Sequence, residues 1–159
     1  MSQELKSKSP EQALAALMHL TAKAERSSGD AMRLMRRWGL SDSDSRKVLE
    51  RLVRERFIDD SRYAEAFAND KVRFSGWGTY KIRAALRAKG ISAELINAAL
   101  ARTDAVSDTE RLAEILRSKA QRTPHKNLAD LKAKVVRFGA SRGFELDKVI
   151  EVTEKILGE

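Results

Sequence analysis

The sequence contains no cysteine and only two prolines among its 159 residues. The absence of cysteine excludes disulfide bonds, thiolate catalysis and cysteine-ligated zinc, and it agrees with a cytoplasmic location. No apolar run approaches the roughly 18 residues that cross a bilayer, so we expect no membrane partner. β-Branched runs are also scarce and no convincing strand is found. Because such a composition favours helix, the sequence predicts an all-α fold.

Acidic residues are outnumbered, with 23 Asp and Glu against 31 Lys and Arg and a net charge of +8. Seven basic residues stand against one acidic residue between positions 71 and 102, and nine against two between 111 and 142. The final segment, 143–159, reverses this balance. The central part of the chain therefore favours a polyanionic partner, either nucleic acid or an acidic protein surface.

Patterns typical of catalysis are missing from the sequence. Its only histidines, His19 and His125, lie in unrelated contexts. Asp59 and Asp60 fall at a predicted helix start, where carboxylates are stabilising without any chemistry. The glycines around Trp77 are not followed by the Lys-Ser/Thr pair of a phosphate loop. We expect no enzyme activity, no metal site and no cofactor.

Three glycines mark an internal repeat. They stand at positions 39, 90 and 143, which are 51 and 53 residues apart. Each follows a basic residue or Trp and precedes a large apolar residue, as expected where a helix stops and a second helix follows. This spacing is typical of stacked supersecondary units. The function is therefore expected to lie on a repeated surface and not in one pocket.

The helix signals predict about nine helices in three sets of three. We expect a disordered tail at 1–8 and three-helix sets at 9–56, 57–103 and 104–159, docked as an elongated, curved array. The first helix should begin at Ser9-Pro10 and run to about Arg26, and Thr79 should cap the helix that ends at Lys89. Residues 74–79 are predicted to form a loop, and Val53 should lie on a buried stripe. Ser107 or Asp108 should open the seventh helix.

Basic side chains on the helices before the glycines are the candidate contact surface. Arg83 and Arg87 are four residues apart and share a helix face, and Trp77 beside them could stack on bases or anchor an interface. Alternatively, the charges are solvated faces opposite apolar stripes and Trp77 packs in the core. The candidate partner- or DNA-binding residues are Arg36, Arg37, Trp77, Lys81, Arg83, Arg87, Lys89, Arg137 and Arg142.

The central segment resembles a known family signature. Phe57-Ile58-Asp59-Asp60-Ser61-Arg62-Tyr63-Ala64 and the stretch from Gly78 to Ser92, with Lys89-Gly90-Ile91 near its end, are similar to the RecX family of bacterial regulators of the RecA recombinase. The family's usual Pro after the first glycine is Thr79 here. We interpret the matching residues as structural, and they are Asp59, Asp60, Arg62, Tyr63, Gly78, Ile82, Leu86, Gly90 and Ile91.

The resemblance implies three tandem three-helix repeats, in agreement with the glycine spacing. It also implies binding in the groove of the RecA–single-stranded DNA filament, where such proteins inhibit strand exchange, ATP turnover and filament growth, and so a role in homologous recombination, DNA repair and the SOS response. The expected partners are the RecA filament and its single-stranded DNA, with direct DNA contact also considered, and the expected state is a monomer. The alternative is a helix-turn-helix-like module that binds DNA without RecA.

Overall fold

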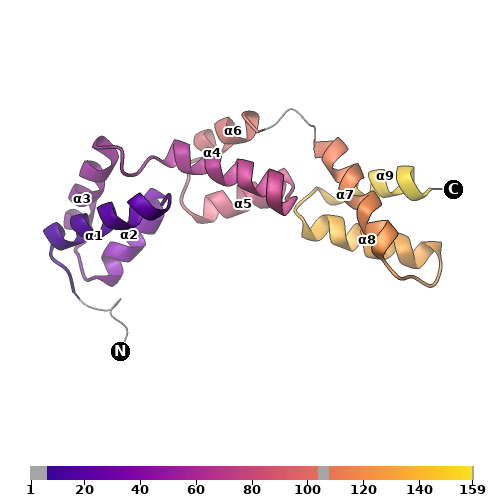
Figure 1. Cartoon of the computed structure of the whole chain (residues 1–159), viewed down its shortest axis with the longest axis horizontal. Coiled ribbons are helices and arrows are strands. Elements are labelled where there is room, and N and C mark those ends of the chain that lie inside the picture. The colour runs from indigo at the N-terminus through magenta and orange to yellow at the C-terminus, as the bar shows by residue number, and fades with distance from the viewer. Residues whose placement is uncertain (1–6, 104–107, 159) are drawn as a thin grey trace. The chain divides into compact units, whose positions relative to one another are not determined.

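The computed structural model describes residues 7–103 and 108–158. Within these ranges the chain forms nine α-helices and one π-helical turn, Lys71–Ser75, with no strand, which confirms the all-α fold (Figure 1). The helices are α1 (Pro10–Lys23), α2 (Ser28–Arg37), α3 (Asp42–Arg54), α4 (Asp60–Asp70), α5 (Thr79–Ala88), α6 (Ala93–Ala101), α7 (Asp108–Arg122), α8 (Leu128–Ser141) and α9 (Leu146–Leu157). No helix in the described ranges is long and apolar enough to cross a membrane.

The predicted start of α1 is confirmed, whereas the end of α1 and the start of α5 differ from the prediction. Ser9 and Gln12 form the predicted capping box at α1. However, α1 ends at Lys23 and not near Arg26, because Ala24 adopts an extended conformation. Thr79 is not the cap of α5 but its first residue, since its hydroxyl donates to Asp108 instead of accepting from the backbone.

Two further expectations concern residues near gaps or loops. Phe74 and Ser75 were predicted to be loop, but they belong to the π-helical turn that directly continues α4. Of the two predicted starts of the seventh helix, Ser107 lies outside the described residues and Asp108 is the first residue of α7. Most of the predicted tail at 1–8 also lies outside them.

The repeated glycines end helices in the predicted way. Gly39, Gly90 and Gly143 have φ values of 85°, 84° and 89°, a left-handed conformation that costs glycine little. In each turn the next residue donates its N–H to the carbonyl five positions back, the bond of a Schellman motif. These bonds are Leu40 N to Met35 O (3.0 Å), Ile91 N to Leu86 O (3.1 Å) and Phe144 N to Gly139 O (3.5 Å).

A fourth turn of this kind ends α3 without a glycine. Arg56 has a φ of 64°, and Phe57 donates its N–H to the carbonyl of Leu52 at 2.9 Å. A residue with a Cβ is strained in this conformation. Arg56 is the one residue other than glycine with a positive φ in the described part of the chain.

Contacts between residues divide the chain into two compact units. The first, called unit 1, is Met1–Glu65 with Leu86–Ala98. In it, α3 packs on α1 and α2, around a core that includes Leu17, Met35 and Leu52. Val53 is 47% exposed and not buried as predicted, because it lies about 100° around the helix from Leu52.

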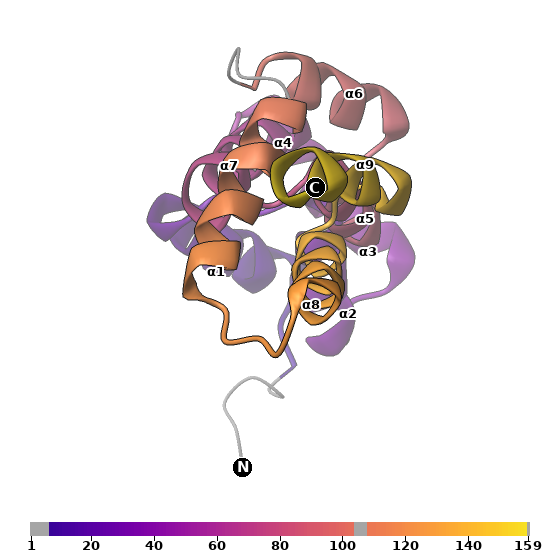
Figure 2. The same ribbon diagram turned by 90° about the vertical axis from the view of Figure 1, so that its right-hand side faces the viewer.

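Unit 2 is Ala66–Ala85 with Ala99–Glu159. Here α7, α8 and α9 pack against one another (Figure 2). Their core includes Leu116, Val135 and Val149, all without exposed surface. The boundaries of the three sets and the curvature of the array stay predictions.

Candidate interaction surface

The start of α2 docks on the end of α5 within unit 1. The Oδ1 atom of Asp60 accepts the N–H of Ser28, the first residue of α2, at 2.8 Å. A Cβ on Gly29 would collide with the carbonyl oxygen of Lys89. The Nζ atom of Lys89 also lies 3.1 Å from Oδ1 of Asp30. We call this arrangement the first joint.

The start of α5 docks on the end of α8 within unit 2 in a similar way, and we call this the second joint. Asp108 accepts hydrogen bonds from both the backbone N–H and the hydroxyl of Thr79, the first residue of α5. Gly78 donates its N–H to the carbonyl of Arg142 at 2.7 Å. A Cβ on Gly143 would overlap the backbone of Lys81. The start of one helix, a carboxylate and a glycine turn thus meet in both units.

Two joint carboxylates remain ionised because of their partners. Burial alone would raise the pKa of Asp30, but hydrogen bonds from Arg33 and Lys89 outweigh it and lower that pKa below 3.8. Burial would likewise raise the pKa of Asp108, and the hydrogen bonds from Thr79 and Arg111 lower it instead. Both joints are therefore held by charge-assisted bonds.

The signature residues of α4 lie in or beside the first joint. Asp59 accepts the N–H of Arg62 at 3.1 Å and so caps the helix start predicted at this position. The Nε atom of Arg62 lies 2.6 Å from Oε2 of Glu25. Burial raises the pKa of the half-buried Tyr63, whose environment includes Lys89 and Asp30. These contacts lie within the chain, and the structural interpretation of the signature stays a prediction.

Several candidate contact residues are held by contacts within the chain. Lys81 donates to the carbonyl of Ser141 at 3.2 Å, and its Nζ lies 4.5 Å from the ring centroid of Trp77. The Nζ atom of Lys71 also lies 4.7 Å from the centroid of the Trp77 ring, and the Phe67 ring packs edge-on to it with centroids 6.1 Å apart. Trp77 is therefore part of a packed cluster. Lys89 belongs to the first joint.

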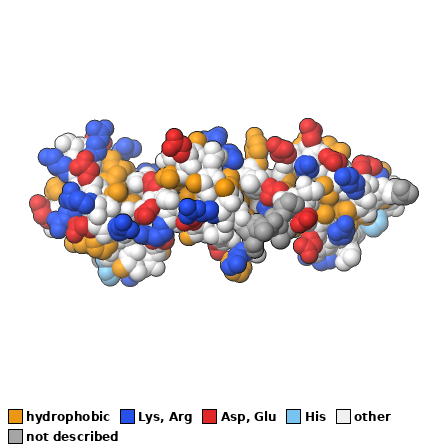
Figure 3. All heavy atoms as spheres, turned by 90° about the horizontal axis from the view of Figure 1, so that it is seen from above, with side chains coloured by type: hydrophobic (Ala, Val, Ile, Leu, Met, Phe, Trp, Pro, Cys, Tyr) orange, Lys and Arg blue, Asp and Glu red, His pale blue; other side chains and the backbone are white. Residues whose placement is uncertain are grey.

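The other candidates differ in exposure. Arg36, Arg37, Arg87 and Arg137 are exposed, whereas Arg83 is half-buried. The glycine turns align Arg36 with Arg87, since each lies three residues before its glycine. On the face in Figure 3, blue Lys and Arg side chains alternate with red acidic ones and do not merge into one patch.

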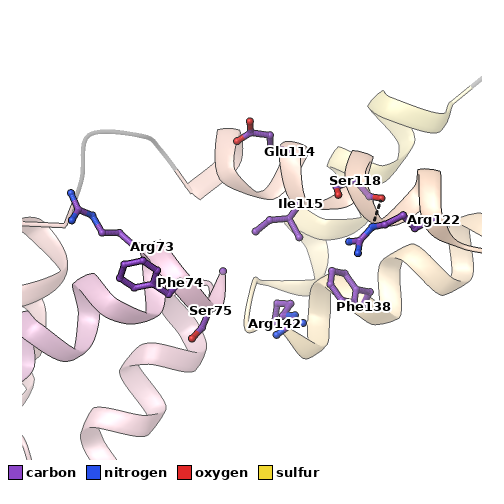
Figure 4. Close-up of a pocket in the computed structure, with 10 residues that line it drawn as sticks. Arg73, Phe74, Ser75, Glu114, Ile115, Ser118, Arg122, Phe138 and Arg142 are labelled. Atoms are coloured by element: carbon purple, nitrogen blue, oxygen red, sulfur yellow. Dashed lines mark hydrogen bonds between the residues drawn. The ribbon is translucent and has the colours of Figure 1, made fainter.

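A groove in unit 2 was missed by the sequence analysis. It has a volume of about 500 Å³ and lies between the π-helical turn, the outer face of α7 and the end of α8 (Figure 4). We call it the Phe74 groove. Its lining residues are Arg73, Phe74, Ser75, Gly76, Glu114, Ile115, Ser118, Arg122, Phe138 and Arg142. Only Arg142 was a candidate, because the other side chains come from segments far apart in the sequence.

In the described ranges, no group of three His, Asp or Glu residues is placed to hold a metal ion. The expectation that the protein is not an enzyme stays a prediction.

Comparison with known proteins gives a consistent result. A family model described as RecX, second three-helix domain, matches residues 59–100. The chain is 32% identical over 145 residues to the Regulatory protein RecX of Mycobacterium sp. (strain KMS), covering 88% of this chain and 79% of that protein. It is 28% identical over 130 residues to the Regulatory protein RecX of Streptococcus gordonii, covering 81% of this chain but 49% of that longer protein.

Solved structures agree on the fold. The crystal structure of RecX from Lactobacillus salivarius superposes with a TM-score of 0.78 at 18% identity, covering 92% of this chain and 96% of that chain. A second crystal structure of a regulatory protein RecX gives 0.81 at 20% identity, covering 92% and 73%.

Proposed function

This chain belongs to the RecX family, and from that premise we propose that it regulates the RecA recombinase by binding the RecA–single-stranded DNA filament. Bound in the groove of the filament, it suppresses strand exchange, ATP turnover and filament growth. The observation that carries the proposal is the 32% identity over 145 residues, which extends well beyond the central signature. The net charge of +8 suits a partner made of acidic protein surface and phosphate.

Exposed arginines are the best candidates for the contact with the filament. Arg36 and Arg87 occupy equivalent places in the last turns of α2 and α5, and Arg37 and Arg137 are exposed as well. The positions also favour cations for a structural reason, since the C-terminal end of a helix carries partial negative charge. Lys81 and Lys89 instead serve the joints, so we assign them a structural role in the proposal.

The proposal is tested with the single-stranded-DNA-dependent ATPase of a cognate RecA. Wild-type protein at sub-stoichiometric ratios should lower the rate. Arg36→Glu with Arg87→Glu should raise the concentration for half-inhibition at least about tenfold, because each lost charge-assisted contact is worth roughly 1.5–3 kcal/mol. Arg46→Glu with Arg51→Glu, also exposed but on α3, makes the same change in charge and is the control.

Two results would contradict the proposal at different levels. If wild-type protein does not change the RecA ATPase, the function itself is wrong. If the double variant on α2 and α5 inhibits as well as wild type while circular dichroism is unchanged, the contact surface lies elsewhere.

Direct reading of duplex DNA is the less favoured alternative. A helix-turn-helix protein places the first residues of its recognition helix against the bases. The helices after the glycine turns begin with acidic residues, namely Asp42 and Asp44 in α3, Glu94 in α6 and Asp147 in α9. In that position these carboxylates would enter a groove flanked by negatively charged phosphates, so the charge opposes this function. Tight, sequence-selective duplex binding without RecA would revive it.

A further inference from the structure

Phe74 is a large apolar side chain that the chain leaves uncovered. It is 81% exposed, at the end of a π-helical turn. The turn closes with a 3.0 Å bond from Trp77 N to Lys71 O, which spans six residues and not the five of the glycine turns described above. One extra residue is therefore accommodated where Phe74 projects. Such π-helical insertions occur frequently at functional sites.

The segment that carries Phe74 is firmly supported. The Nζ atom of Lys71 lies over the rings of both Phe67 and Trp77, at 5.4 and 4.7 Å from their centroids. Arg111 donates to the carbonyl of Trp77 at 3.1 Å. Gly76 ends the turn with a φ of 63°. The backbone segment that carries the exposed ring is thus held by cation–π contacts and hydrogen bonds.

Cations surround the groove next to this ring. Arg73, Arg122 and Arg142 line it, against one carboxylate, that of Glu114. In the described part of the chain none of these three arginines forms an ion pair. Figure 4 shows Arg122 bonded to Ser118, and the acceptor is the backbone carbonyl at 3.2 Å. The three guanidinium groups therefore retain N–H donors that can bind an anion.

A second aromatic ring, that of Phe138 on α8, lines the groove. The guanidinium of Arg142 lies 5.0 Å, and the ammonium of Lys119 4.7 Å, from the centroid of Phe138. These cation–π contacts orient two positive charges beside the groove. Phe138 is half-buried and engaged, so Phe74 is the ring that remains open to a ligand.

We propose that the Phe74 groove binds single-stranded nucleic acid, with a base stacked on Phe74 and the backbone phosphates on Arg73, Arg122 and Arg142. An exposed aromatic ring beside several guanidinium groups that retain N–H donors is the combination that such strands require. A duplex keeps its bases stacked inside, and an acidic peptide would engage the arginines without using the ring. The inference rests on the proposed function, because it names the surface that meets the DNA of the filament.

The test measures fluorescence anisotropy of a labelled oligo-dT of about 15 nucleotides with the full chain and no RecA. Phe74→Ala should weaken binding about 5- to 100-fold, because base stacking on an aromatic ring contributes about that much. Phe74→Trp should restore it. Tyr80→Ala is the matched control, since Tyr80 is 69% exposed and lies outside the groove.

The arginines are tested by salt dependence. Arg122→Gln should reduce the slope of log affinity against log salt by about 0.7, the value for one phosphate contact on a single strand. Arg117→Gln is the control, because Arg117 is exposed on the same helix, α7, but does not line the groove. Equal slopes for the two variants would contradict the assignment.

The outcomes separate this inference from the proposed function. Unchanged oligo-dT affinity in Phe74→Ala, or an equal loss in Tyr80→Ala, overturns the inference. Unchanged oligo-dT affinity with weaker inhibition of RecA would assign the groove to a protein partner and overturns it too. The proposed function fails only if wild-type protein leaves the RecA ATPase unchanged, and the oligo-dT assay does not depend on that result.

Discussion

Replacing Gly143 with alanine should push the start of α5 away from the end of α8 in the second joint. Gly143 combines a φ of 89° with a backbone contact, since an added Cβ would overlap Lys81. Gly39 is the matched control. It has a φ of 85° in the same kind of turn, but the nearest atom to its added Cβ is Oγ of Ser7 at 3.9 Å.

The free energy of unfolding should fall by different amounts in the two variants. Gly39→Ala introduces a left-handed residue at about 1–2 kcal/mol, partly offset by a less flexible unfolded chain, for a net loss of about 1 kcal/mol. Gly143→Ala carries the same cost and must also push the start of α5 away. That displacement strains the Gly78–Arg142 hydrogen bond and the local packing, which adds about 1–3 kcal/mol.

Chemical denaturation measures the total loss in the free energy of unfolding, and hydrogen exchange shows which backbone amides lose protection. In Gly143→Ala the amides of Gly78 and Ile82, which bond to Arg142 and Gly78, should lose protection. In Gly39→Ala they should keep it. Equal losses of stability and unchanged protection at the start of α5 would refute the close approach of α5 to the end of α8.

Two further predictions concern single side chains. Asp108→Asn should destabilise the protein at neutral pH, and its difference in unfolding free energy from wild type should disappear as the pH falls through and below 3.8. The pKa of Asp108 is lowered in the folded state, so its contribution to stability is present above the unfolded-state pKa and is lost when the carboxylate is protonated. Urea unfolding from pH 7 to 3 measures this difference, and a difference that stays constant with pH would contradict the prediction. Arg56→Gly should raise the free energy of unfolding by about 0.5–1 kcal/mol, because glycine adopts the φ of 64° without the strain that a Cβ causes there. A loss of stability in the same urea measurement would show that the contacts of the Arg56 side chain outweigh this backbone strain.

Local signals carried most of what could be predicted about the helices. Ser9, Ser27 and Asn127 lie three residues before the N–H that each accepts, so their role depends on neighbours in the sequence. The glycine turns are equally local, and their φ values follow from the absence of a Cβ. Such features can be identified without knowing the tertiary structure.

The joints and the groove could not be predicted, because their parts are distant in sequence. Asp60 lies 32 residues from Ser28, and Asp108 lies 29 residues from Thr79. A threonine before a helix is an ordinary cap by its local pattern, so the local pattern predicts the wrong role for Thr79, whose hydroxyl donates to the distant Asp108. For the same reason, Lys81 and Lys89 looked like free surface charges although both bind within the chain.

The turn that ends α2 uses the segment before α1 to satisfy a backbone carbonyl. In the second joint, Arg142 receives an N–H from Gly78; in α2 the equivalent carbonyl, that of Trp38, receives the N–H of Lys8 at 3.0 Å. At the start of α8, Asn127 and Asp130 supply the acceptors locally. Lys8 and Asn127 thus satisfy, at the end of α2 and the start of α8, the kinds of backbone group that Gly78 and Asp108 satisfy in the second joint, so these two helix ends need no docked helix for those bonds.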